Sequence, residues 1–190
     1  LGDGTTTSRN TPVAIPGFSG VSVIDADRSH SLAIRIDGRV WTWGGNASGQ
    51  IGDGGTSSRL SPFQVPGVPA SQAIGGGFRA SYAIDNEGVV WSWGDNSHGK
   101  LGLGDTNNRT GQSLIQTLND VVMIAAGGNH SVVVKRDKSV WAFGLNDSGQ
   151  LGNNSRTPSS TPVQTSSLST ALAVAAGDGR ALVGIERQVH

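Results

Sequence analysis

Short runs of apolar and β-branched residues recur along the chain, and each is followed by glycine, asparagine, aspartate, serine or proline. Residues 121–165 contain four such runs in succession: VVMIAAGG, HSVVVKR, SVWAFG and TPVQT. None of them shows the spacing of 3.6 residues that a helix requires, and turn-forming residues separate them. The pattern therefore predicts four short strands in about 50 residues, joined by tight turns.

The pattern repeats with a period of 50 residues. The segments VWTWGGNASGQIG, VWSWGDNSHGKLG and VWAFGLNDSGQLG begin at Val40, Val90 and Val140, and six of their thirteen positions are identical. A period of this length is typical of repeat proteins in which each repeat forms one supersecondary unit. We therefore expect an all-β fold, a β-propeller of four-stranded antiparallel blades with about four 50-residue repeats.

The period also sets the expected boundaries within a single repeat array, residues 1–190. LGDGTTTSRNTPV at the start matches IGDGGTSSRLSPF further along, so the chain is expected to begin inside a repeat of a longer array. Residues 1–20 should then supply the loop and outer strand of a preceding repeat, with the strand near TPVAI. The expected units are blade 1 at 21–70, blade 2 at 71–120, blade 3 at 121–170 and a partial blade 4 at 171–190.

Pairs of aromatic residues recur within one strand of each repeat. Trp41 and Trp43 are two residues apart, so their side chains point to the same face of a strand. Blades pack face to face, and large rings fill the space between them, which widens away from the axis. We therefore predict a structural role between blades for Trp41, Trp43, Trp91, Trp93, Trp141 and Phe143. The small residues near columns 24–27 are expected at the axis, where bulky side chains would collide.

Composition excludes several classes of function. The 14 basic and 14 acidic residues cancel, which removes the excess positive charge that nucleic acid or an anionic membrane attracts. The absence of cysteine excludes disulfides, thiolate zinc sites and cysteine nucleophiles. No apolar run approaches the ~18 residues that cross a bilayer. We expect no cofactor, no nucleic-acid partner and no membrane insertion, while the compartment stays open between cytoplasmic and secreted or cell-surface.

Motifs that suggest catalysis or ligand binding have simpler structural interpretations. Gly94–Lys100 has the glycine and lysine spacing of a phosphate-binding loop, but Leu101 stands where Ser or Thr is required, so we interpret it as a turn. His30 and His130 are expected to hydrogen-bond a neighbouring blade. No Ser-His-Asp triad is visible, because the adjacent His30 and Ser31 point to opposite faces of a strand. The chain is therefore expected not to be an enzyme.

Two aspartates interrupt the column of small residues near the axis. Asp25 and Asp27 replace glycine or alanine and lie on one face of their strand. They could pair with Arg28, bind water or a cation in the central channel, or face solvent. The aspartates of the GDG turns do not have the spacing of a calcium loop, so no metal site is assigned to them.

The sites most suited to recognition are the positions that vary between repeats while the flanking strands stay constant. These positions fall in columns 28–29 and 47–48. An unconstrained surface loop would give the same pattern. The predicted partner-binding residues are Arg28, Ser29, Ala47, Ser48, Phe78, Arg79, Ser97, His98, Asn129, Asp147 and Asp178.

The repeat resembles that of the regulator of chromosome condensation family. The resemblance rests on AAGGNHS at 125–131, VWAFG at 140–144, Asn146, GQLG at 149–152 and Pro162-Val163, and it recurs in register along the chain. It implies a β-propeller, usually with seven blades, of which this chain would supply about half. The members of this family are mainly protein-binding proteins, and their partners contact loops on one face.

The resemblance implies a non-enzymatic protein–protein interaction propeller, of a bacterial style, that binds an unknown protein partner. The alternatives are a guanine-nucleotide exchange factor for a small GTPase and an inhibitor of a secreted hydrolase such as a β-lactamase. Phe78-Arg79 is similar to a Trp-Arg pair in a plant photoreceptor of the family. About half a ring should form an open arc, and its exposed apolar end faces could support self-association.

Overall fold

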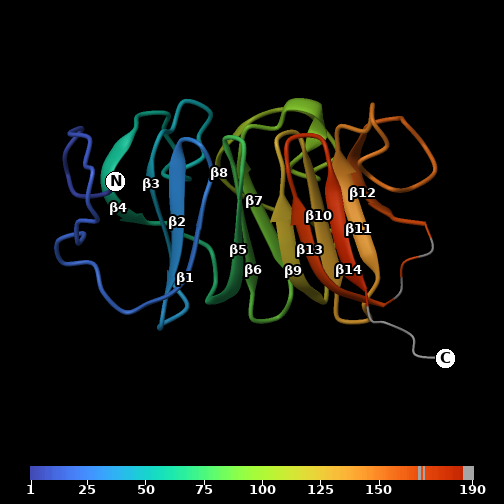
Figure 1. Cartoon of the computed structure of the whole chain (residues 1–190), viewed down its shortest axis with the longest axis horizontal. Helices are drawn as coiled ribbons and strands as arrows, with labels where there is room; N and C mark the ends of the chain where they lie inside the picture. Colours follow the sequence, from blue (N-terminus) through green and yellow to red (C-terminus); the bar gives the residue numbers. More distant parts are fainter. Residues whose placement is uncertain (167, 169, 186–190) are drawn as a thin grey trace.

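A computed structural model of the chain describes residues 1–166, 168 and 170–185, which form an all-β molecule (Figure 1). The first sheet contains β1 (Val21–Ala26), β2 (His30–Arg35), β3 (Val40–Gly44) and β4 (Arg59–Gln64). The second contains β5 (Ser71–Gly77), β6 (Ala80–Asp85), β7 (Val90–Gly94) and β8 (Arg109–Leu114). The third contains β9 (Val121–Ala126), β10 (His130–Lys135), β11 (Val140–Gly144) and β12 (Ser159–Gln164). The last contains β13 (Ala171–Ala176) and β14 (Ala181–Ile185).

Each sheet is antiparallel, and its strands lie side by side in chain order. A single turn of 3₁₀ helix, η1 (Ser97–Gly99), follows β7. The four sheets are called blades 1 to 4 below. The predicted all-β, partial propeller of four-stranded blades is confirmed, and blade 4 contributes two strands within the described residues. Residues 186–190, which the prediction placed in blade 4, lie outside the described residues.

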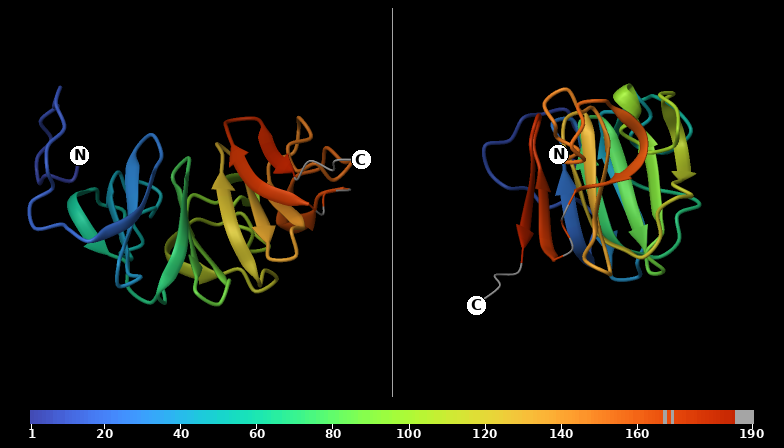
Figure 2. Two further views of the ribbon diagram at one scale, coloured as in Figure 1. Left: turned by 60° about the horizontal axis from the view of Figure 1, so that its bottom comes forward. Right: turned by 90° about the vertical axis from the view of Figure 1, so that its right-hand side faces the viewer.

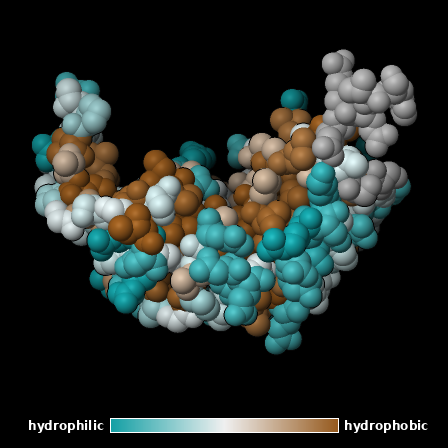
Figure 3. All heavy atoms as spheres, turned by 90° about the horizontal axis from the view of Figure 1, so that it is seen from below, coloured by the Kyte–Doolittle hydropathy of each residue, from teal (hydrophilic) through white to brown (hydrophobic). Residues whose placement is uncertain are grey.

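The blades stand side by side along an open arc, with β1, β5, β9 and β13 on its concave edge (Figure 2, left). Hydrophobic atoms gather along the hollow of this arc (Figure 3). Ile24, Met123 and Leu172, on three of the innermost strands, expose 40–76% of their surface. No helix among the described residues is long and apolar enough to cross a membrane.

Small residues let the innermost strands approach one another. A Cβ at Gly76 would lie 2.9 Å from Leu32 Cδ1, and one at Gly77 would lie 2.8 Å from Ala126 Cβ. Larger side chains at these two positions would push the blades apart. The close approach is the reason, as the sequence predicted, for glycine and alanine in this column.

The first 20 residues do not contain the predicted outer strand, since the first strand begins at Val21. A strand needs a hydrogen-bonded neighbour, and residues 11–15 have none beside them among the described residues. The segment instead lies as a loop on blade 1. The ring of Phe18 meets those of Trp41 and Trp43 edge-on, with centroids 5.4 and 5.6 Å apart. The Gly4 amide donates to the Leu60 carbonyl. The same bond recurs one and two periods later, from Gly54 to Thr110 and from Gly104 to Ser160.

One aromatic ring fills each of the first two junctions between blades. Trp93 is fully buried, packs with Leu32 and Ile34 of blade 1 and with Ile74 of blade 2, and donates from Nε1 to the Gln50 carbonyl at 2.9 Å. Phe143 occupies the equivalent position in blade 3 and contacts Tyr82 of blade 2, with ring centroids 6.5 Å apart. These rings bury the apolar faces that single blades would expose.

The other aromatic column is less buried than expected. Trp41, Trp91 and Trp141 are half-buried, whereas Trp43, Trp93 and Phe143 are buried. Trp91 donates from its indole to Asp85 Oδ2 at 3.1 Å, and Trp141 donates to Ser139 Oγ at 3.2 Å, so both also bond within their own blades. Trp93 and Phe143 are therefore the rings enclosed between blades, whereas Trp43 is buried at the blade 1 end against Phe18 and Gly2.

Candidate functional site

The two variable columns lie beside each other on one face of the arc. The first column occupies the turns between the two innermost strands of each blade, and the second follows the third strand. Backbone hydrogen bonds join them: the amides of Gly45, Asp95 and Leu145 donate to the carbonyls of Ser29, Arg79 and Asn129 at 2.7–2.8 Å. This end of the blades is called the loop face.

Most of the predicted partner-binding residues present their side chains on the loop face. Phe78 and Asn129 are half-buried, and the exposed ones are Arg28, Ser29, Ala47, Arg79, Ser97, His98, Asp147 and Asp178. Ser48 is an exception, because it is only 8% exposed and its amide donates to Gln50 Oε1 at 2.9 Å. Ser48 therefore contributes to the turn through its backbone, and little of its side chain is open to a partner.

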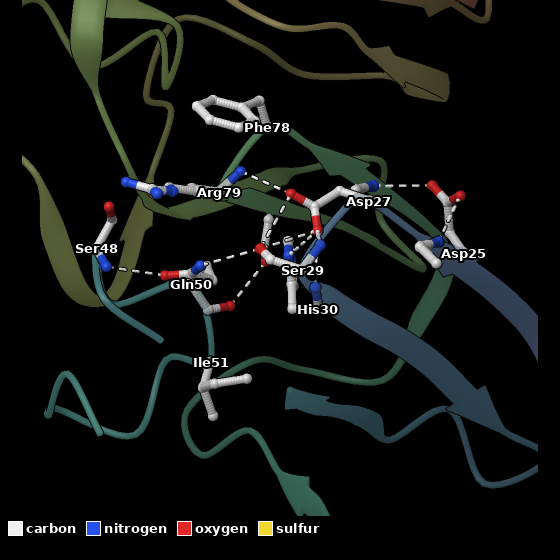
Figure 4. A network of polar contacts seen from close by, with 12 residues as sticks. Asp25, Asp27, Ser29, His30, Ser48, Gln50, Ile51, Phe78 and Arg79 are labelled. Carbon is white, nitrogen blue, oxygen red and sulfur yellow. Dashed lines mark hydrogen bonds and ion pairs between the residues drawn. The ribbon is translucent and has the colours of Figure 1, made fainter. Parts of the chain in front are cut away.

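Asp27 is the centre of a polar network that ties the first turn to blade 2 (Figure 4). Its Oδ1 accepts from His30 Nδ1 at 2.8 Å and from the Ser29 and His30 amides, and its Oδ2 accepts from the Arg79 amide at 2.8 Å. The Asp27 side chain is only 5% exposed. Nearby, Asp25 Oδ2 accepts from the Gly76 amide at 2.8 Å. Both aspartates therefore bond the next blade, and neither pairs with Arg28.

The network keeps Asp27 ionised. Burial raises the pKa of this carboxyl, but the hydrogen bond and charge of His30 and the amides of Arg79 and Ser29 outweigh it. The resulting pKa lies well below the usual range for aspartate. Among the described residues, no group of three or more histidine, cysteine or acidic side chains is placed to hold a metal ion.

His30 connects this carboxylate to a serine of the next blade. Its Nε2 lies 2.7 Å from Ser81 Oγ, and Ser81 Oγ also donates to the Gln50 carbonyl at 2.8 Å. Asp27, His30 and Ser81 thus form a Ser-His-Asp arrangement that the sequence analysis, which considered only Ser31, did not find. Ser81 stands one period after Ser31, so comparing neighbouring repeats could have identified it.

The arrangement is structural. Ser81 is 0% exposed and His30 is 2% exposed, so a substrate has no access to the hydroxyl. A catalytic serine must instead stand within reach of the bond that it attacks. The predicted hydrogen bond from His30 to a neighbouring blade is confirmed, and its partner is Ser81.

The corresponding positions at the other junctions differ. Between blades 3 and 4, Gly127 and Ala181 replace Asp27 and Ser81, and neither ring nitrogen of the buried His130 has a hydrogen-bond partner among the residues that the structure describes. Burial lowers the pKa of His130, and the Arg180 backbone of blade 4 offsets this shift only in part. Ala181 offers no hydroxyl, so the side-chain bond between His30 and Ser81 has no counterpart at His130 within the described part of the chain.

Lys100 ties the loops of blades 2 and 3 together. It is 1% exposed, and its Nζ donates to the carbonyls of Phe78 and Gly128 at 2.8 and 3.1 Å and pairs with Asp95. Burial lowers the pKa of this amine and Asp95 opposes that shift. The lysine of the Gly94–Lys100 segment thus points into the protein and bonds its carbonyls, as suits a turn. Sequence reasoning did not assign it this role between blades.

Three cations surround Phe78. The Cζ atoms of Arg28 and Arg79 lie 5.9 and 5.2 Å from the centroid of its ring, and Lys100 Nζ lies 5.4 Å from it. Phe78 and Arg28 also line a hollow of about 390 Å³ that the turns of all four blades enclose, with Asp178 on the blade 4 side. The loop face therefore combines an aromatic ring, nearby cations and a concave surface.

Comparison with known proteins identifies the repeat. The family model described as the regulator of chromosome condensation (RCC1) repeat matches residues 37–83, 87–134 and 137–183, and a second model of the same description matches residues 121–150. A search of curated proteins found no match.

Solved structures share the fold at low sequence identity. The crystal structure of Prp20p from Saccharomyces cerevisiae superposes with a TM-score of 0.81 at 18% identity, over 91% of this chain and 45% of Prp20p. Yeast RCC1 (Prp20) bound to Kap60 gives 0.77 at 23% identity, over 88% and 42% of the two chains. Human WBSCR16 gives 0.66 at 16% identity, over 97% and 64%. This chain thus spans less than half the length of the yeast protein.

Replacing Asp27 with asparagine should weaken the first junction. At pH 7 we expect Asp27→Asn to lower the free energy of unfolding by about 1–3 kcal/mol, because hydrogen bonds to a charged, shielded group are lost. Since folding lowers the pKa of Asp27, its contribution is complete above the ordinary aspartate value of about 4 and falls as the pH drops below it.

Urea unfolding of both proteins at pH 7 and pH 3 measures this effect. The difference between wild type and Asp27→Asn should shrink at pH 3. Asp178→Asn, which removes an exposed carboxylate from the same face, serves as the control and should change stability by less than about 0.5 kcal/mol. Equal destabilisation by Asp27→Asn at the two pH values would refute the electrostatic role of Asp27.

Proposed function

The chain belongs to the regulator of chromosome condensation repeat family, and we propose that it is a non-enzymatic protein-binding propeller that engages a partner protein through its loop face. The observation that carries this proposal is the contrast within that face. Variable, exposed side chains stand on turns that hydrogen bonds to Asp27 and of His30 and Lys100 hold in place. Binding surfaces are commonly built from variable loops on a rigid scaffold.

Solved structures of proteins with a similar fold also support the proposal that this chain binds a protein. Prp20p is described by its binding to Gsp1p and histones, and a second structure shows it bound to Kap60. A propeller of such repeats can therefore present a surface to other proteins. The partner of this chain is not inferred from those proteins, because the sequence identity is 18–23%.

The chemistry of the loop face favours binding over catalysis. The serine of the Asp27–His30–Ser81 arrangement is enclosed between blades 1 and 2. Of the eleven residues predicted to bind a partner, only Phe78 is aromatic, whereas strong interfaces concentrate their energy in Trp, Tyr and Arg. A weak or moderate protein interaction suits this face better than tight inhibition of a hydrolase.

Position-specific photo-cross-linking tests the proposal. A p-benzoylphenylalanine in place of Ser97 or Asp147 stands on the loop face, whereas one in place of Glu87 or Asp137 stands in an exposed turn at the opposite end of a blade. In lysate of the source cells, we expect the same protein to cross-link at Ser97 and Asp147 and at neither of the other two positions. Cross-linking that favours Glu87 and Asp137 would contradict the assignment of the binding face.

The end faces of the arc support a second proposal, that isolated chains associate with one another. A largely apolar hollow of about 700 Å³ lies at the blade 1 end, lined by residues that include Phe18, Ile24 and Trp43. At the other end, Leu182 and Ile185 are 68% and 55% exposed. Exposed apolar surface of this kind promotes association.

Analytical ultracentrifugation of the isolated chain, with an apolar-surface dye in parallel, measures this tendency. We expect the sedimentation coefficient to rise with concentration, and an Ile24→Ser, Leu182→Ser double variant to reduce that rise and the dye fluorescence. A monomer that binds no dye at any concentration would contradict self-association.

A further inference from the structure

We propose that Arg28, Phe78 and Arg79 form a recognition site for a short acidic peptide segment, whose carboxylate binds between the two guanidinium groups beside the Phe78 ring. This inference rests on the proposed function, because it names the partner chemistry of the loop face. The three residues come from the turns of blades 1 and 2: Arg28 and Phe78 line the hollow formed by the turns of all four blades, and the Arg79 guanidinium lies beside the Phe78 ring.

The two guanidinium groups are available to a ligand. Arg28 and Arg79 are exposed, and neither forms an ion pair with any residue that the structure describes. The nearby Asp27 carboxylate is shielded and already bonded to His30 and to three backbone amides. Both arginines instead lie within 6 Å of the Phe78 ring centre, which adds cation–π attraction and restricts their positions. Guanidinium groups match carboxylates in a two-point geometry, so the pair suits an acidic side chain.

The backbone that carries Phe78 and Arg79 is fixed before any ligand arrives. Arg79 has a φ of 56°, a conformation that side-chain-bearing residues rarely adopt. Its amide donates to Asp27 Oδ2, and its carbonyl accepts from the Asp95 amide, both at 2.8 Å. The Phe78 amide donates to the Gly127 carbonyl, and the Phe78 carbonyl accepts from Lys100 Nζ. A turn held from both sides loses little conformational entropy on binding.

Charge on the rest of the loop face limits the kind of acidic ligand. Asp147 and Asp178 are exposed on blades 3 and 4, without an ion-pair partner in the described part of the chain, and Asp178 also lines the hollow. An extended polyanion such as a nucleic acid would cross these carboxylates and be repelled. The net charge of zero supplies no general attraction for phosphates either. A local acidic segment therefore fits the face better than a nucleic acid.

The site belongs to one junction only. In blade 3 the residues that correspond to Phe78 and Arg79 are Gly128 and Asn129, and in blade 4 they are Asp178 and Gly179. The repeat itself does not require an aromatic or a cation at these positions. The shared fold therefore does not explain why an aromatic ring and two arginines meet at the turns of blades 1 and 2.

The test is an NMR titration of the whole chain with three probes: acetylated hexaglutamate, acetylated hexaglutamine and the oligonucleotide dT6. We expect hexaglutamate to shift the Nε–H signals of Arg28 and Arg79 and the Phe78 ring signals, and hexaglutamine to leave them unchanged. The Arg28→Glu, Arg79→Glu double variant should weaken hexaglutamate binding by about tenfold or more. Arg136→Glu, which makes the same charge change in an exposed turn at the opposite end, should have no effect.

Unshifted tryptophan indole signals will show that the double variant is folded. Arg79→Lys keeps the positive charge, so it should weaken hexaglutamate binding less than the double variant does. Hexaglutamate binding that is absent, or that the double variant retains, would overturn the inference. So would dT6 binding that is tighter than hexaglutamate binding and equally sensitive to the two arginines. If cross-links from Ser97 and Asp147 persist in the double variant, the proposed function stands and only the acidic recognition fails.

Discussion

The enclosure of one aromatic ring between adjacent blades is the interaction on which the rest of this structure depends. A single four-stranded blade leaves an apolar face uncovered, so the repeats are stable only when they stack. Trp93 closes the first junction with side chains of both blades and a hydrogen bond to the Gln50 carbonyl, and Phe143 closes the second. The same Gln50 carbonyl accepts from Ser81, which binds His30 and, through it, Asp27. The enclosed Trp93 ring and the polar network of the loop face therefore both bond the Gln50 carbonyl.

The three junctions differ in how many polar contacts reinforce them. Between blades 1 and 2, Asp27, His30 and Ser81 form a continuous chain of hydrogen bonds. Between blades 2 and 3, Ser131 bonds the hydroxyl of Tyr82, and Lys100 reaches carbonyls on both sides. Between blades 3 and 4, the imidazole of His130 is buried without a hydrogen-bond partner in the described part of the chain. The proposed acidic-peptide site lies on the first junction, where this continuous chain of hydrogen bonds is found.

Much of the fold follows from the sequence because the determining pattern is local and repeated. Strands, turns and the innermost small residues depend on neighbours along the chain and recur every 50 residues. The variable columns were also identifiable from the sequence, since each follows a fixed strand of its repeat. The missing strand near residues 11–15 shows the limit of this reasoning, because a strand depends on a partner that the local sequence does not supply.

Contacts between repeats were harder to predict. Which tryptophan of a pair is enclosed depends on the angle between blades, and both residues of the pair satisfy the same alternation. Ser81 is 51 residues from His30, so their hydrogen bond appears only when adjacent blades are compared. Ser48 is only 8% exposed, whereas Ser148, whose amide makes the same contact with Gln150, is exposed, so the composition of the turn does not reveal which of them is buried.

The most direct test of the central role of the enclosed ring is the free energy of unfolding of Trp93→Ala compared with Trp91→Ala, measured by urea denaturation. The two substitutions remove the same side chain from the same strand, two residues apart. We predict a loss of roughly 3–5 kcal/mol for Trp93→Ala and a clearly smaller loss for Trp91→Ala, which is half-buried. Should Trp93→Ala prove too unstable to fold, Trp93→Phe, which keeps a ring at the junction, should restore a folded chain. A loss for Trp91→Ala that equals or exceeds that for Trp93→Ala would contradict the account.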